Sequence, residues 1–201
     1  MKTIFLLDVD TQRDFMLPGG ALYVPGAERI IPKLRRLFDF ARKNELFILS
    51  STDAHAPDDP EFKDFPPHCV RGTVGQRKID ETLLPRPLTI ENKPADRNWI
   101  ETVRKHQQIV VQKQSLDLFT NPSVGKLIRV LPPHAFVFGV TTEYCVKLAA
   151  LGLRKSGVKT VVISDAIAAL SPESGEKAVE EMRRAGADFI TTDTLMGVLS
   201  A

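Results

Sequence analysis

The sequence predicts a three-layer α/β fold, with helices packed on both faces of one mainly parallel sheet of about six strands. Nearly continuous apolar runs of three to seven residues recur along the chain, and such runs are typical of strands buried on both faces. Segments with helical spacing of apolar residues lie between these runs, and alternating strands and helices form a parallel sheet. With 201 residues and 43% hydrophobic content, a single domain over residues 1–201 is expected.

The expected strands are apolar runs at residues 3–9, 46–49, 109–111, 135–140, 158–164 and 189–191, with a weaker candidate at 88–90. Helical spacing of apolar residues predicts a helix that starts at Ala27, further helices at 99–105, 122–131 and 146–156, and a last one between Ser171 and Gly186. Asn121 and Ser171 each precede a proline, which is a typical start of a helix. This order of elements predicts a doubly wound, Rossmann-like αβα sandwich.

Charge and composition exclude several classes of function. The net charge is +2 and the charges are interspersed, so no basic face for nucleic acid is expected. No window approaches the roughly eighteen apolar residues of a membrane span, and the first ten residues lack a signal peptide. We therefore expect a cytoplasmic protein in which Cys69 and Cys145 are free thiols.

A long proline-rich stretch, residues 53–87, is predicted to be a functional loop region that binds metal. Asp53 and His55 are two residues apart at a strand end, so both can face one cavity, and His68 follows thirteen residues later. Two imidazoles and a carboxylate with open positions describe a catalytic site for zinc, iron or manganese. The alternative is that these residues cap loops and lie on the surface.

Four strand ends carry different chemistry: Asp10, Asp53, Lys113 and Cys145. The carboxyl ends of parallel strands lie at one edge of the sheet, where such folds place their sites. A carboxylate, an ammonium and a thiol together make an activated nucleophile. Cys145 lies in a strand-to-helix turn, where N–H groups favour thiolate, but an ionised Asp10 would disfavour it, so the sign of the pKa shift stays open. Taken singly, each could be an ordinary capping, surface or packing residue.

Five motifs resemble those of the isochorismatase-like cysteine hydrolases, and within them the metal-containing nicotinamidases. They are D-T-Q-R-D-F at 10–15, T-D-A-H at 52–55, P-H-C-V-R-G-T-V-G at 67–75, Lys113 after its strand, and G-V-T-T-E-Y-C-V at 139–146. The motifs follow one another in the family's order, and the resemblance covers essentially the whole chain.

The resemblance implies a catalytic triad of Asp10, Lys113 and Cys145. It also implies a cis peptide at Val140–Thr141, so that the N–H groups of Thr141 and Cys145 form an oxyanion hole. The implied reaction is hydrolysis of nicotinamide to nicotinate and ammonia through a thioester on Cys145.

The resemblance further implies one divalent metal ion, zinc before iron or manganese, that binds the pyridine nitrogen of the substrate. Its ligands would be Asp53, His55 and His68, with Glu61 as a candidate for a further ligand. Phe15 and Phe65 would line the ring pocket. Nicotinamidases usually have tryptophan where this chain has Phe65, and the segment after Lys113 also departs from their pattern, so the pocket is expected to be reshaped.

Several other functions stay open at this stage. The first is hydrolysis of another small amide or ureido compound by the same cysteine chemistry. The others are cleavage of the vinyl ether of isochorismate, a non-catalytic binding domain, and a redox role through Cys69 and Cys145. In each enzyme hypothesis the partner is a small molecule, and a homo-oligomer is expected.

Overall fold

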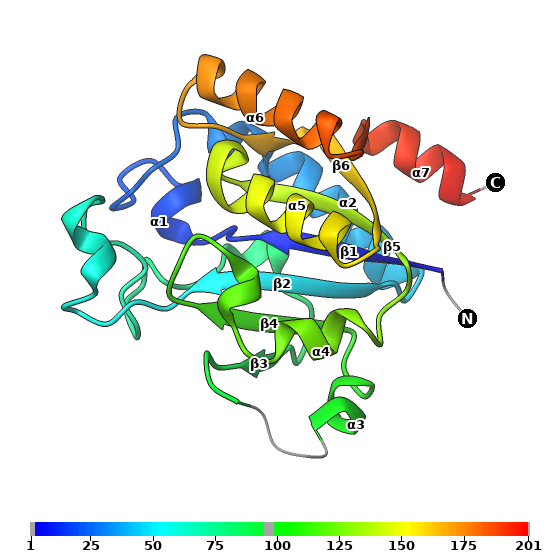
Figure 1. Cartoon of the computed structure of the whole chain (residues 1–201), viewed down its shortest axis with the longest axis horizontal. Helices are drawn as coiled ribbons and strands as arrows, with labels where there is room; N and C mark the ends of the chain where they lie inside the picture. The colour runs from blue at the N-terminus through cyan, green and yellow to red at the C-terminus, as the bar shows by residue number, and fades with distance from the viewer. Residues whose placement is uncertain (1–2, 95–98, 201) are drawn as a thin grey trace.

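The computed structural model describes residues 3–94 and 99–200, and they form one seven-stranded sheet between two layers of helices (Figure 1). Every strand pair is parallel, and the strand order is β3-β4-β2-β1-β5-β6-β7. The strands are β1 (Ile4–Val9), β2 (Phe47–Asp53), β3 (Leu88–Ile90), β4 (Gln108–Lys113), β5 (His134–Val140), β6 (Lys159–Ala168) and β7 (Asp188–Ile190). The predicted fold class is confirmed, with seven strands instead of about six.

Two hydrophobic cores hold the layers together, one on each face of the sheet. Side chains alternate along β1, so Phe5 and Leu7 enter one core while Ile4 and Leu6 enter the other. The first core is covered by α3 (Trp99–Val103), α4 (Val124–Ile128), α5 (Lys147–Lys155) and α6 (Pro172–Arg184). The second is covered by α1 (Arg13–Met16), α2 (Ile31–Lys43) and α7 (Thr192–Ser200). Burial on both faces explains why the central strands read as continuous apolar runs.

Some helix predictions are corrected by the structure. The expected helix at 122–131 is shorter and comprises only α4. The turn before it is held by Asn121, whose Nδ2 donates to the carbonyls of Gln112 and Glu91 and whose Oδ1 accepts from Ser123 N. The expected helix at 146–156 is preceded by a π-helical turn, Thr142–Val146, which contains Cys145. The short helix α1 and the last helix, α7, were not predicted.

The topology places a switch point between β1 and β5. From β1 the chain builds β2, β4 and β3 on one side, and from β5 it builds β6 and β7 on the other. Ligands of open α/β sheets bind at the carboxyl ends of the strands beside such a point. None of the helices within 3–94 and 99–200 combines the length and apolarity needed to cross a bilayer.

Candidate active site

The thiol of Cys145 lies in the turn that leaves β5, and the residue is 5% exposed. The Val140–Thr141 peptide that enters this turn is cis, as the resemblance implied. The preceding Gly139 has φ 120°, and a Cβ there would lie 2.0 Å from the carbonyl oxygen of Val9. Only glycine therefore allows the end of β5 to approach β1 this closely.

Lys113 is fully buried and contacts all three other strand-end groups. Its Nζ lies 3.6 Å from Cys145 Sγ and 2.5 Å from Asp53 Oδ1, and it forms an ion pair at 2.9 Å with Asp10 Oδ2 that lacks hydrogen-bond geometry. Strand register explains one of these contacts, because Asp53 of β2 and Lys113 of β4 are direct partners in the ladder. The structure thus brings the predicted carboxylates, ammonium and thiol together.

Charge and burial set the protonation of this cluster. Burial alone would lower the pKa of Lys113, but the carboxylates of Asp10 and Asp53 raise it well above its usual value, so the ammonium form is held. Burial raises the pKa of Cys145 well above that of a free thiol; Lys113 opposes this rise and Asp10 adds to it. The sign that the sequence left open is therefore upward, and the resting group is a neutral thiol.

Asp10 is aimed by the turn that follows β1. Its φ is 48°, in the left-handed region that aspartate tolerates better than most residues. Its N–H donates to the carbonyl of Ser51 at 3.3 Å, and its Oδ1 accepts from the Ser51 hydroxyl at 2.7 Å. These two bonds to β2 fix the carboxylate beside Lys113.

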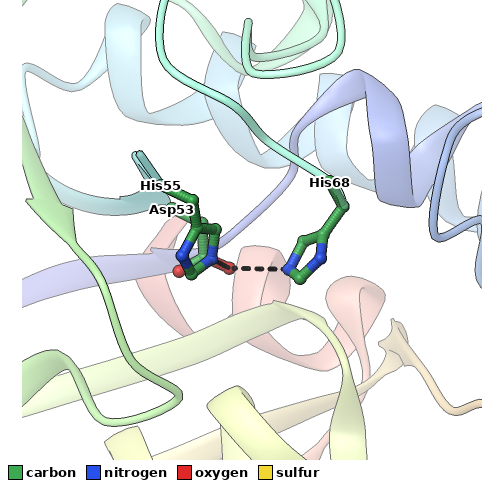
Figure 2. A group of neighbouring side chains, drawn as sticks. All are labelled: Asp53, His55 and His68. Carbon is green, nitrogen blue, oxygen red and sulfur yellow. Dashed lines mark ion pairs between the residues drawn. The ribbon is translucent and has the colours of Figure 1, made fainter. Parts of the chain in front are cut away.

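Asp53, His55 and His68 converge in the way Figure 2 shows, with the Asp53 carboxylate facing the imidazole of His68. Asp53 Oδ2 lies 3.9 Å from His55 Nε2 and 4.0 Å from His68 Nε2. Glu61 Oε1 lies 3.8 Å from each of the same two nitrogens. Two ligands at about 2.0–2.2 Å from one zinc ion can be at most about 4.4 Å apart, so all four distances fit a shared ion.

The far sides of both imidazoles are occupied by acceptors. His55 Nδ1 lies 3.0 Å from Asp59 Oδ2, and His68 Nδ1 lies 2.8 Å from the carbonyl of Pro66. For His68, a proton on Nδ1 matches the Pro66 carbonyl and leaves Nε2 as the ligand atom, which is the usual outer arrangement of metal-bound histidine. Both ring nitrogens of His55 are buried and, within the described chain, have no partner with hydrogen-bond geometry, so the Asp59 carboxylate contacts Nδ1 as an ion-pair neighbour. The donor set fits a divalent cation.

The charge balance supports the same conclusion. Three carboxylates, those of Asp10, Asp53 and Glu61, share this buried region with one ammonium, that of Lys113. Burial raises the pKa of Asp53 to about 6 and raises that of Glu61 as well. It also lowers the pKa of His68, which favours the neutral imidazole that a metal requires.

One cavity is lined by both groups of residues. Cys145 and Thr141 form part of its wall, and Asp53, Glu61 and His68 form another part. The remaining wall is mainly apolar or aromatic and comprises Phe15, Leu22, Phe65, Leu116, Tyr144 and Leu170. Both predicted ring contacts, Phe15 and Phe65, therefore lie where a ligand would be held.

Sequence reasoning missed several residues that shape the site. The Gln12 side chain accepts from the N–H of Asp53 at 2.6 Å and donates to its carbonyl at 2.9 Å and to that of Gln76 at 2.7 Å. Its place in the D-T-Q-R-D-F motif was the signal, but nothing in the motif named its partners. Asp59 and the leucines of the cavity wall carried no signal, because they sit in loops without periodicity.

The fold and the buried thiol beside a lysine and an aspartate define an α/β enzyme of the cysteine-hydrolase class. The isochorismatase domain matches residues 5–194, and the chain belongs to that family. It is therefore an isochorismatase-family hydrolase.

Similar proteins match this chain over nearly their full lengths. The nicotinamidase of Saccharomyces cerevisiae is 26% identical over 214 residues, which cover 91% of this chain and 96% of the yeast protein. The structure of Pyrococcus horikoshii pyrazinamidase in complex with zinc is 27% identical, with a TM-score of 0.79, and covers 94% of this chain and 99% of that one.

A second similar structure is N-carbamoylsarcosine amidase from Thermoplasma acidophilum. It has a TM-score of 0.74 at 22% identity and covers 96% of this chain and 98% of that one. This likeness shows the fold alone.

Proposed function

We propose that the protein is a nicotinamidase, which hydrolyses nicotinamide to nicotinate and ammonia. The observation that carries the proposal is the shared cavity, in which the Cys145 thiol and the donors Asp53, Glu61 and His68 line one space. A ligand that meets both sides needs an electrophilic carbonyl at one end and an electron-pair donor at the other. A pyridine ring with a carboxamide at the meta position meets this requirement.

The thiol acts as the nucleophile in this proposal. Asp10 takes the proton from Cys145 as its sulfur attacks the carboxamide carbon, and the oxygen becomes negatively charged. Lys113 and the N–H groups of Thr141 and Cys145 stabilise that charge. The C–N bond then breaks, Asp10 passes the proton to the nitrogen, and ammonia leaves.

A thioester between Cys145 and the nicotinoyl group remains. Asp10, again a carboxylate, takes a proton from water, and the oxygen of that water attacks the thioester carbon. The C–S bond breaks, the thiol recovers a proton, and nicotinate is released. One water is consumed and one ammonia is produced in each turnover.

Asp53, His55 and His68 would hold a divalent ion, with Glu61 as an additional ligand. When bound, such an ion supplies an acceptor for the electron pair of the pyridine nitrogen and so orients the ring. Phe15 and Phe65 are placed to contact the faces or edges of that ring.

The charge of the cavity wall favours this function over the alternative of another small amide or ureido compound that bears a carboxylate. The charged residues lining the cavity, Asp53 and Glu61, are acidic, and the nearby ammonium of Lys113 is already paired with two carboxylates. Apart from a bound metal ion, whose charge the carboxylates of Asp53 and Glu61 would offset, an anionic substrate such as isochorismate would find no cationic side chain among the described lining residues. A neutral amide avoids this penalty.

Ammonia release from nicotinamide by the metal-loaded protein tests the proposal. We expect turnover that falls by at least about 10³-fold in Cys145→Ala, since loss of a nucleophile removes the covalent route. Pyrazinamide, benzamide and N-carbamoylglycine complete the panel, and the first should react better than the other two. A protein that binds no divalent metal and turns over no pyridine carboxamide would refute the proposal.

A further inference from the structure

The Thr141 hydroxyl is a buried group for which the fold provides no partner. Thr141 lines the cavity beside Cys145 and is 7% exposed. Its Oγ1 is buried and, within residues 3–94 and 99–200, makes no hydrogen bond. It also does not cap the turn that follows it, although a threonine at such a position usually does. An unsatisfied buried hydroxyl is costly, which points to a partner that arrives with the ligand.

The carboxamide of the proposed substrate lacks one partner in the cavity. In the proposed mechanism its oxygen is bound by the N–H groups of Thr141 and Cys145, but its NH₂ group has two donors that need acceptors. Among the polar side chains of the described lining, Asp53, Glu61 and His68 belong to the metal-binding set. Tyr144 is 36% exposed, and its hydroxyl is not among the buried groups without a partner.

We propose that Thr141 Oγ1 accepts a hydrogen bond from the carboxamide N–H of the substrate and makes the enzyme selective for amides over esters. This inference deepens the proposed function and rests on it. The acceptor would hold the leaving nitrogen on the side opposite the oxyanion donors and so present the carbonyl carbon to Cys145. An ester has no N–H to donate and gains nothing from the hydroxyl.

Paired substrates and paired variants test this role. The metal-loaded wild type, Thr141→Val and Thr141→Ser are compared for kcat/KM on nicotinamide and on methyl nicotinate. We expect Thr141→Val to lose about 10- to 100-fold on the amide and less than about 3-fold on the ester. Thr141→Ser, which keeps the oxygen, should restore most of the amide activity. Equal losses on both substrates, or no loss on the amide, would overturn the inference.

Thr142→Val is the matched control. Thr142 is the next residue of the same turn but lines a different groove, together with Pro172 and Val179. The ratio of kcat/KM on nicotinamide to kcat/KM on methyl nicotinate should be the same for Thr142→Val as for the wild type, even if both rates change. A ratio that falls as far as in Thr141→Val would show that any change in the turn has this effect, and would overturn the assignment to Thr141.

Unfolding of the metal-free proteins gives a measurement that does not depend on the substrate. Because the hydroxyl makes no hydrogen bond to any other part of the described chain, Thr141→Val should leave the denaturation midpoint unchanged or raise it. A clearly lower midpoint would reveal a partner inside the protein and overturn the inference. Failure of the wild type to hydrolyse nicotinamide would instead refute the proposed function, and the unfolding result would still show whether the Thr141 hydroxyl has a partner inside the protein.

Discussion

Replacing Lys113 by methionine should cost a large part of the stability of the protein as well as its activity. The substitution keeps most of the apolar volume but leaves Asp10 and Asp53 buried without the ammonium that contacts both. Among the described residues, Asp10 has no other cation within 4.0 Å. Breaking a buried ion pair by removing one partner costs about 3–5 kcal/mol. The free energy of unfolding of a small domain is about 5–15 kcal/mol, so a fifth or more of that total is expected to be lost.

The assay is urea denaturation at pH 7 in the presence of a chelator, so that metal binding does not contribute to stability. Lys126→Met, an exposed lysine of α4, is the control and should change the unfolding free energy by less than about 0.5 kcal/mol. Adding Asp10→Asn to Lys113→Met should recover about 1–2 kcal/mol, because one unpaired carboxylate is removed. A loss below about 1 kcal/mol in Lys113→Met, or no recovery in the double variant, would refute this account of the buried cluster.

Two further predictions concern an outer residue of the metal site and a helix cap. Asp59→Asn should weaken the affinity for zinc about 10- to 100-fold in chelator competition, since Asp59 orients His55. The control is Asp58→Asn at the exposed neighbouring residue, which should leave the zinc affinity unchanged. Equal effects of the two substitutions would contradict the role of Asp59. Asp165 accepts from the N–H and hydroxyl of Thr192 at the start of α7 and forms an ion pair with Lys33 at 3.1 Å. Burial raises the pKa of Asp165, but these contacts outweigh burial and lower it. Asp165→Ala should cost about 1–2 kcal/mol at pH 7. Because the pKa of Asp165 is lower in the folded state, the difference in unfolding free energy between wild type and Asp165→Ala should persist above about pH 4 and shrink below it. The measurement is denaturation at a series of acidic pH values, and a difference that stays constant with pH would contradict the ionic contribution.

The sequence was most informative where a signal depended on neighbours along the chain. Runs such as 3–9 and 109–111 must be strands buried on both faces, and the end of each run marks a carboxyl end of the sheet. Parallel pairing then requires Asp10, Lys113 and Cys145 to meet at one edge, whatever the details of the loops. The motifs added the cis Val140–Thr141 peptide, and the structure confirms it.

Helix boundaries were predicted less well, because a contact distant in sequence can outweigh local preference. Asn121 reads as a cap, yet its amide is used by the carbonyls of Gln112 and Glu91, and α4 is short. Helix α7 has a weak pattern of its own, and its start is fixed by Asp165, 27 residues earlier in the chain.

The sequence by itself determined the fold class, the edge of the sheet that carries the site, and the residue types of a thiol nucleophile and a metal-binding group. Only the tertiary structure decided how they interact. The β2–β4 register sets Asp53 beside Lys113, and burial decides that the pKa of Cys145 rises. The cavity that joins thiol and metal donors is closed by Leu22, Leu116 and Leu170 from three separate segments. Periodicity along a chain reports which residues are buried, but pairing across strands, desolvation and cavity shape arise from contacts between distant segments.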